Sequence, residues 1–238
     1  MVTCLADTVM PAAARATVEV LERLGHEVVF PQAQTCCGQM HANTGYLPEA
    51  ASLARRTIDI FAEYEAVVSP SASCVGTIRE QYVQLAEEAG DAALATDART
   101  LAPKVFELSE FLIDVLRVTD IGAALTARVA YHPTCHSLRV LRLGDKPERL
   151  LAAVEGLELV ALADSAECCG FGGTFSVKNA DTSGAMLADK MANIRASNVD
   201  ILCAVDASCL MHIGGGLRRG GSGPRTMHLA EILASGQR

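Results

Sequence analysis

The sequence of 238 residues contains no tryptophan, and aromatic residues make up only 4% of it. Basic residues are also scarce, with 20 Lys and Arg against 28 Asp and Glu, and the formal net charge is −8. Nucleic-acid-binding surfaces need clustered Lys and Arg to contact phosphates, so this charge balance argues against nucleic acid as a partner. No apolar run reaches the ~18–20 residues of a membrane span, and we therefore expect no membrane-spanning segment.

Several motifs are missing as well. The chain has no complete GxGxxG and no GxxxxGK[ST], so nothing indicates a nicotinamide site or a P-loop nucleotide site. It also lacks C-x₂-C-x₂-C, the run typical of bacterial ferredoxins. The first residues do not resemble a signal peptide, because Asp7 interrupts a very short apolar stretch. With 50% hydrophobic and 20% charged residues, the composition is that of a globular chain, which we expect to be cytoplasmic.

Against this background the chain is rich in cysteine, with nine residues of this type. An odd count, a chain long enough to build a core and an expected reducing compartment all argue against a disulfide scaffold. Clustered cysteines in such a chain are more often metal ligands or redox thiols. Cys203 lies within an apolar segment, and we expect it in the core.

The other eight cysteines form a repeated pattern. The triplet Cys-Cys-Gly occurs twice, at 36–38 and at 168–170, and a single cysteine precedes it by 32 and 33 residues respectively. Another cysteine follows the doublet by 37 and 40 residues. We refer to Cys4, Cys36, Cys37 and Cys74 as the first cysteine set, and to Cys135, Cys168, Cys169 and Cys209 as the second. The repeat indicates a duplication, with an N-terminal lobe at 1–120 and a C-terminal lobe at 121–238.

Short apolar segments alternate with helical segments in both halves. This alternation predicts parallel βαβ units, and hence an α/β fold of two pseudo-symmetric Rossmann-like lobes, each carrying one Cys-Cys-Gly loop. The segment 90–127 is expected to be mostly helical, and the glycine-rich tract 214–223 to be a loop. The predicted strands are 2–5, 27–30 and 66–69 in the first half, and 128–131, 157–162 and 200–205 in the second.

The cysteines fall where such a fold binds ligands. The four single cysteines each follow a predicted strand and lie at or before the start of a predicted helix, and ligands bind beyond the carboxyl ends of parallel strands. The partial positive charge of a helix N-terminus favours thiolate over thiol. Two adjacent cysteines can address one site only from a tight turn, which Gly38 and Gly170 permit. We therefore expect the four cysteines of each lobe to converge.

Four thiolates suffice for an iron–sulfur cluster. Zinc and metal-free thiols remain open, although the close C-x₂₋₄-C pairs of structural zinc sites are missing. Ser71 and Asp206 each stand three residues before the last cysteine of a set, where either could add an oxygen ligand. His132 and His136 flank Cys135, and His212 follows Cys209 by three residues. Roles for these histidines as ligands, redox groups or local hydrogen-bond partners stay open.

The motifs resemble those of the cysteine-rich CCG-domain family, which includes the cysteine-rich subunit of heterodisulfide reductase and the iron–sulfur subunit of glycolate oxidase. Within this family, the chain is most similar to the iron–sulfur subunits of L-lactate oxidation complexes. The resemblance covers essentially the whole chain. It is carried by PQAQTCCGQMHANTGY, VVSPSASC, ELSEFL, YHPTCH, ECCGFGGTFSVK and DASCLMHI.

This resemblance implies one or two iron–sulfur clusters, of the 4Fe-4S type, held by the eight cysteines of the two sets. It further implies an electron-transfer subunit of a cytoplasmic complex that oxidises L-lactate to pyruvate, acting with two partner subunits, one of them ferredoxin-like. A thiol–disulfide redox subunit like heterodisulfide reductase, or a protein like the glycolate oxidase subunit, is the alternative. A zinc-stabilised interaction module is the non-redox alternative.

The chain departs from the fullest family motif in one respect. That motif ends in CxxC and gives five cysteines per half, which hold a non-cubane four-iron cluster in heterodisulfide reductase. Here Ser71 and Asp206 stand in place of the first of these two cysteines, so each half keeps four and an ordinary cluster is expected. We also expect the second set to retain metal better, because Asp206, Gly172 and Gly173 offer it additional ligands or amide donors.

Overall fold

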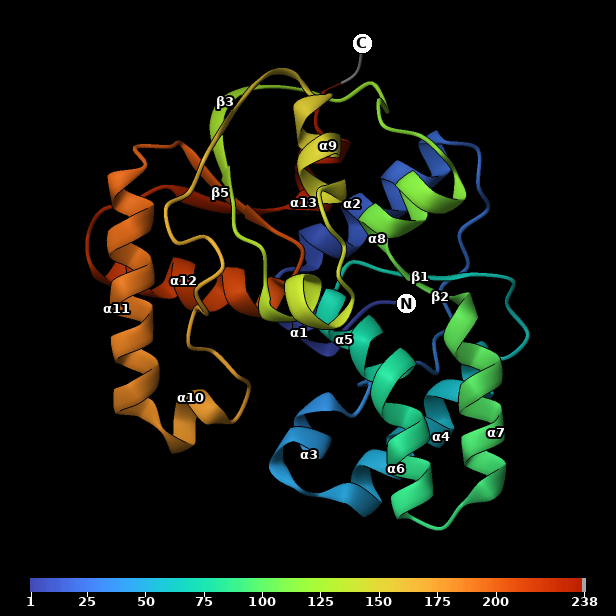
Figure 1. Cartoon of the computed structure of the whole chain (residues 1–238). Helices are drawn as coiled ribbons and strands as arrows, with labels where there is room; N and C mark the ends of the chain where they lie inside the picture. Colours follow the sequence, from blue (N-terminus) through green and yellow to red (C-terminus); the bar gives the residue numbers. More distant parts are fainter. Residues whose placement is uncertain (237–238) are drawn as a thin grey trace.

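The computed structural model describes residues 1–236, so the last two residues of the predicted second lobe lie outside it (Figure 1). Helices dominate, and the strands form two parallel sheets. The first half contains α1 (Cys4–Val9), α2 (Pro11–Arg23), α3 (Gln39–Thr44), α4 (Leu47–Phe61), β1 (Val67–Ser69), α5 (Ala72–Gly76), η1 (Thr77–Gln81), α6 (Tyr82–Glu88), α7 (Ala92–Leu101), η2 (Ala102–Lys104), β2 (Val105–Glu107), α8 (Leu108–Glu110) and η3 (Phe111–Val115). The second half contains β3 (Ala124–Tyr131), η4 (His136–Val140), α9 (Lys146–Ala152), β4 (Glu155–Val160), α10 (Phe175–Lys178), α11 (Ala180–Ala196), β5 (Ile201–Ala204), α12 (Ala207–Arg219), β6 (Arg225–His228) and α13 (Leu229–Ala234).

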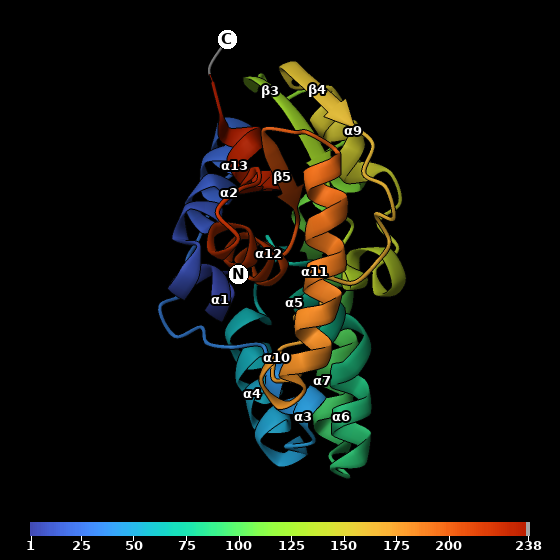
Figure 2. The ribbon, with the colours of Figure 1, turned by 90° about the vertical axis from the view of Figure 1, so that its left-hand side faces the viewer.

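The second half is a three-layer structure around a four-stranded parallel sheet with the order β4-β3-β5-β6. Side chains alternate across the strands, so Val129 and Cys203 face one layer while Ala130 and Leu202 face the other. Helices α9 and α13 cover the first face, and α11 and α12 cover the second (Figures 1 and 2). Cys203 is fully buried, which confirms its predicted place in the core.

The first half is built on the smaller sheet, formed by β1 and β2. On one face, Val67 and Val105 pack into a cluster with helices α4 to α7. On the other face, Val68 and Phe106 pack against the cluster that contains β3 and β5. The two-stranded sheet is therefore sandwiched between a small helical layer and the larger core, and this arrangement brings its carboxyl edge to the second half.

Contacts cross the lobe division that the sequence predicts at residue 120. Helix α2 packs along α13, and the Arg23 guanidinium donates to the carbonyl oxygens of Leu233 (3.2 Å) and Ala234 (2.8 Å). Buried residues of both halves belong to one hydrophobic cluster. The boundary itself stays a prediction about the duplicated sequence segments.

The predicted α/β class, with parallel sheets in both halves, is confirmed, but several local predictions are wrong. Residues 2–5 are not a strand, because α1 begins at Cys4 with Thr3 as its cap. Residues 27–30 also lack a paired neighbour, and Val29 and Phe30 are exposed. Strand β2 lies in the segment expected to be mostly helical, and α12 extends into the glycine tract as far as Arg219. Apolar patterning without a partner strand was not sufficient to make sheet.

The two halves repeat a local structure beyond the cysteine motif. Glu107 ends β2 and caps α8, and His228 ends β6 and caps α13, with the same backbone angles of φ −73° and ψ 148°. The Glu107 carboxylate accepts from the Ser109 amide (2.7 Å), and His228 Nδ1 accepts from the Ala230 amide (3.1 Å). This equivalence supports the predicted duplication. Within the described chain, no helix has both the length and the apolar character needed to cross a membrane.

Candidate metal centre

All eight cysteines of the two sets line one cavity of about 130 Å³ between the two halves. Each single cysteine lies at the start of a helix, and each doublet lies in the loop that leads to the next helix. Beyond the cysteines, polar and small residues such as Gln39, Asn43 and Gly172 complete the wall. Two sets that are far apart in the sequence therefore face the same space.

In the first set, the sulfur atoms lie in two close pairs. The Cys4 thiol donates to Cys36 Sγ at 3.5 Å, and the Cys37 thiol donates to Cys74 Sγ at 3.2 Å. The buried Tyr82 hydroxyl donates to the Cys37 carbonyl oxygen at 2.7 Å and holds the doublet in place. Sulfur atoms at these separations can bind a common metal centre.

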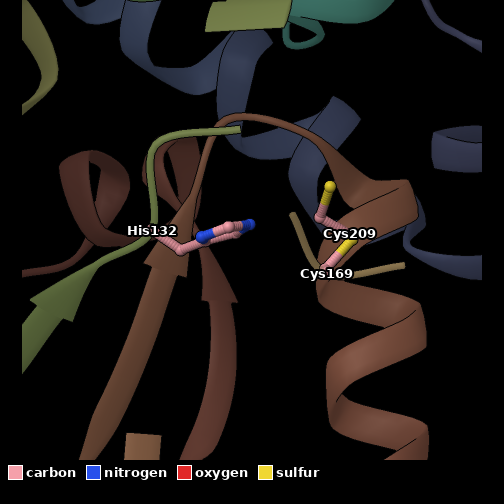
Figure 3. A group of neighbouring side chains, drawn as sticks. All are labelled: His132, Cys169 and Cys209. Atoms are coloured by element: carbon pink, nitrogen blue, oxygen red, sulfur yellow. The ribbon is translucent and has the colours of Figure 1, made fainter. Parts of the chain in front are cut away.

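The second set is mounted on the larger sheet. Cys135 follows β3, and Cys209 lies in the first turn of α12, which follows β5. A nitrogen of His132 and the sulfur atoms of Cys169 and Cys209 all lie within 4.8 Å of one another. Figure 3 shows the His132 ring directed towards these two sulfur atoms. The second set thus has a nitrogen donor beside its sulfur atoms.

The same turn places both doublets. Gly38 has φ +86° and Gly170 has φ +87°, a left-handed conformation that strains residues with a side chain. The Gly38 amide donates to Cys36 Sγ at 3.4 Å, and the Gly170 amide donates to Cys168 Sγ at 3.3 Å. A Cβ atom on Gly170 would lie 2.6 Å from the Ser183 carbonyl oxygen. The predicted need for glycine in these turns is confirmed.

Hydrogen bonds divide each set into a thiolate and its donors. Bonds from the thiols of Cys37 and Cys4, and from the Gly38 amide, lower the pKa of Cys36 to about 2. Those from Cys135 and Cys169 do the same for Cys168, whose pKa is also about 2. Four adjacent thiolates would repel one another, so a set can ionise fully only beside a cation.

The donors show the reverse effect. Donation to Cys36 is the main cause that raises the pKa of Cys4, and donation to Cys168 raises that of Cys135. The Cys209 pKa is lowered to about 7, mainly by a hydrogen bond from Cys169, with smaller contributions from His132. Sets of this composition suit iron–sulfur clusters or zinc.

Ser71 and Asp206, the predicted oxygen ligands, reach the cavity but are engaged with each other. The Ser71 hydroxyl donates to Asp206 Oδ1 at 2.8 Å, and the backbones of the two residues form an antiparallel bridge. Asp206 Oδ1 also accepts from the Ser73 amide (3.0 Å), while Oδ2 accepts from the Thr134 hydroxyl (2.5 Å). One buried carboxylate thus joins the turns that lead to Cys74 and Cys135 to the strand that leads to Cys209.

The other two candidate histidines are placed differently from His132. His136 lines the cavity, and its Nε2 accepts from the Gln39 side-chain amide at 2.9 Å. His212 is not among the cavity-lining residues, and its ring lies 5.8 Å from that of Phe171. Among these histidines, His132 is the one grouped with two cysteines in the described part of the chain.

Sequence reasoning missed Lys190, which lies in α11 within a stretch that looks like an ordinary amphipathic surface. Its side chain is fully buried, and its ammonium donates to the carbonyl oxygens of Asp164 (2.8 Å) and Ser165 (3.2 Å). These bonds hold the loop that leads to Cys168 and Cys169. No sequence signal could have found this role, because lysine is almost always exposed.

This arrangement agrees with the comparison against known families. The model of the cysteine-rich domain CCG matches residues 1–79 and 129–214, which contain both cysteine sets. The chain belongs to this family of cysteine-rich proteins.

Individual relatives share nearly the full length. The chain is 46% identical over 232 residues to Lactate utilization protein A of Geobacillus kaustophilus (strain HTA426), covering 98% of this chain and 96% of the relative. It is 46% identical over 237 residues to the protein of that name from Exiguobacterium sp. (strain ATCC BAA-1283 / AT1b), with 99% and 96% coverage. The Halalkalibacterium halodurans protein, also called Lactate utilization protein A, is 44% identical over 232 residues, with 98% and 94% coverage.

Proposed function

We propose that this chain is an iron–sulfur electron-transfer subunit of a cytoplasmic complex that oxidises L-lactate to pyruvate. The observation that carries the iron–sulfur part is the convergence of eight cysteines on one cavity. The names of its relatives support the link to lactate. By the same resemblance, the partners are two further subunits, one of them ferredoxin-like.

Each cysteine set supplies the four thiolates that a 4Fe-4S cluster requires. Such a cluster stores and releases single electrons without moving the protein. Cys36 and Cys168, with their low pKa values, offer the first anionic attachment points. The Gly38 and Gly170 amides already donate to these sulfur atoms, and amide donors of this kind stabilise an anionic centre.

The cavity is poorly suited to lactate itself. None of the described residues that line it is Arg or Lys, so nothing offers a cationic partner for a carboxylate. The ionised thiols would repel an anionic substrate as well. We therefore propose that lactate is bound by a partner protein of the complex and that this chain receives the electrons. The purified chain alone is expected to show no lactate turnover.

Two other functions remain as alternatives. A zinc-stabilised interaction module would use the same thiolates, although structural zinc sites are normally closed whereas these cysteines line an open cavity. A thiol–disulfide redox subunit would need a substrate sulfur to reach the cavity, which its position between the halves permits. Metal analysis separates the first alternative from the proposal, and the electron donor separates the second.

The test is anaerobic reconstitution of the full chain with iron and sulfide. Two 4Fe-4S clusters would give about eight iron and about eight labile sulfide per chain, with broad visible absorption that reduction bleaches. Cys203→Ser, which removes a cysteine outside the cavity, serves as the control and should retain all the iron. A colourless chain with stoichiometric zinc contradicts the proposal. Reduction by lactate should then require the partner subunits, and reduction that depends on a thiol substrate instead would favour the second alternative.

A further inference from the structure

The second cysteine set has a fifth donor close to its sulfur atoms. His132 is 1% exposed, and one of its ring nitrogens lies within 4.8 Å of the sulfur atoms of Cys169 and Cys209. In residues 1–236 this is the one group of three His, Cys or carboxylate residues whose ligand atoms all approach so closely. Figure 3 shows the ring extending from the end of a strand into the space in front of both sulfur atoms.

The backbone fixes the ring in this place. The His132 amide donates to the Cys203 carbonyl oxygen at 2.8 Å, which continues the pairing of β3 with β5 by one residue beyond Tyr131. His132 therefore leaves the carboxyl end of the central strand, where α/β sheets bind their ligands. Packing of the buried ring prevents it from turning to solvent.

Burial of this imidazole is unfavourable unless it has a function. Its Nδ1 atom is buried and has no hydrogen-bond partner, a situation that costs about 1–3 kcal/mol. A histidine that served only the core would be expected to have a partner at this atom. Imidazole nitrogen, in contrast, is a common ligand of iron and zinc, and the ring meets two sulfur donors at once.

We propose that His132 is a protein ligand of the metal centre of the second set, together with Cys169 and Cys209. This inference rests on the proposed function, because it requires a metal centre at this set. The first set has no equivalent trio in the described chain. The two centres are then chemically different, and the neutral imidazole gives the second one the higher reduction potential, since His in place of thiolate raises the potential of iron–sulfur centres.

The test uses the full chain, labelled with ¹⁵N-histidine, reconstituted anaerobically and reduced. Pulsed electron paramagnetic resonance should detect a strongly coupled ¹⁵N nucleus in the wild-type chain. His212→Gln removes an imidazole of the same half that does not line the cavity, and it should keep this signal. His132→Gln should lose it. Absence of the coupling from a wild-type chain that holds a reduced cluster, or its persistence in His132→Gln, overturns the inference.

A second variant covers the case in which His132→Gln does not fold, as judged by circular dichroism. His132→Cys keeps a soft ligand at the position, so it should retain the iron but lose the ¹⁵N coupling; a retained coupling rejects the assignment. A wild-type chain that takes up no iron and sulfide contradicts the proposed function instead. The role of His132 is then decided with Co²⁺: His132→Gln should bind it at least tenfold more weakly than His212→Gln, and equal binding overturns the inference.

Discussion

The first and second cysteine sets carry the same motif on unequal supports. The first is mounted on a two-stranded sheet and a small helical layer, whereas the second is mounted on a four-stranded sheet covered on both faces. The Cys-Cys-Gly turn is nevertheless the same in both, with φ of +86° and +87° at its glycines. The turn is therefore a local structure that tolerates different scaffolds, because its geometry depends on one glycine and on the bonds within the motif.

The surroundings of the two sets differ more than the motif does. Tyr82 holds the first doublet through a carbonyl oxygen, while Lys190 holds the loop before the second. His132 stands beside the second set. Between them, Asp206 binds residues of both halves. The sets can thus be separated by mutations at the motif, and joined in their response by mutations at Asp206.

The largest effect is expected at Asp206. Asp206→Ala removes the acceptor of three hydrogen bonds, so we expect a loss of about 3 kcal/mol or more in the free energy of unfolding. Because these bonds lead to Cys74 and Cys135, iron should fall in both sets, below half of the wild-type content. Urea unfolding and iron per chain measure the two effects.

Two variants control this prediction. Asp206→Asn keeps an acceptor for Ser71 and Ser73, and it should restore most of the iron. Asp200, at the other end of β5, is exposed and accepts from the Arg128 amide, so Asp200→Ala should leave the iron unchanged. A full complement of iron in Asp206→Ala would show that the two sets form without this link.

Next in size is the difference between the doublets. Cys37→Ser and Cys169→Ser each remove one sulfur, and each should lose up to about half of the iron after anaerobic reconstitution. We expect Cys169→Ser to lose more, because its set has the additional donor His132 and should hold metal better in the wild-type chain. Greater loss in Cys37→Ser would reverse the predicted asymmetry.

The glycines of the two turns give a smaller comparison. A Cβ atom at Gly170 would meet the Ser183 carbonyl oxygen at 2.6 Å, whereas at Gly38 the nearest contact is the Ala50 carbonyl oxygen at 3.3 Å. Both variants also force alanine into a left-handed conformation, which costs about 1–2 kcal/mol. Gly38→Ala should lose about that amount of stability and Gly170→Ala about 2–4 kcal/mol. Equal losses in urea unfolding would mean that α11 yields as easily as α4.

The smallest effect concerns pH and the equivalent caps Glu107 and His228. Burial raises the pKa of Glu107 from 4.5 to about 7, so between these values the folded chain binds a proton that the unfolded chain has lost. Stability should therefore fall as the pH rises from about 4.5 to 7, by about 1 kcal/mol per pH unit. The measurement is the difference in urea unfolding between metal-free wild-type chain and Glu107→Gln at pH 5, 6 and 7. A difference that does not change with pH contradicts this.

His228 should respond in the opposite direction. Burial lowers its pKa below 6.5, so the unfolded chain binds the proton more readily, and the stability that His228 contributes should be lost as the pH falls below about 6.5. His228 Nε2 also bonds the Pro70 carbonyl oxygen of the first half at 3.0 Å. His228→Gln should flatten the acid side of the stability profile and leave the change from pH 6.5 to 8 as in the wild-type chain.

Much of the second half could be predicted from its sequence. Strands 128–131 and 200–205 overlap β3 and β5, because long apolar runs between helices are specific signals for buried parallel strands. The first half was harder. Residues 27–30 have the same apolar character, yet they lie outside the sheet, since a strand forms only where a neighbour accepts its hydrogen bonds.

The sequence by itself determined the two cysteine sets, the glycine turns and the helix starts that carry the single cysteines. These features depend on neighbouring residues, and local rules of conformation are sufficient for them. Tertiary structure decided that both sets share one cavity, that Asp206 links the halves and that Lys190 is buried. The physical reason is that a polar side chain takes its role from the partner it meets, and contacts such as that between Ser71 and Asp206 exist only where the two halves pack together.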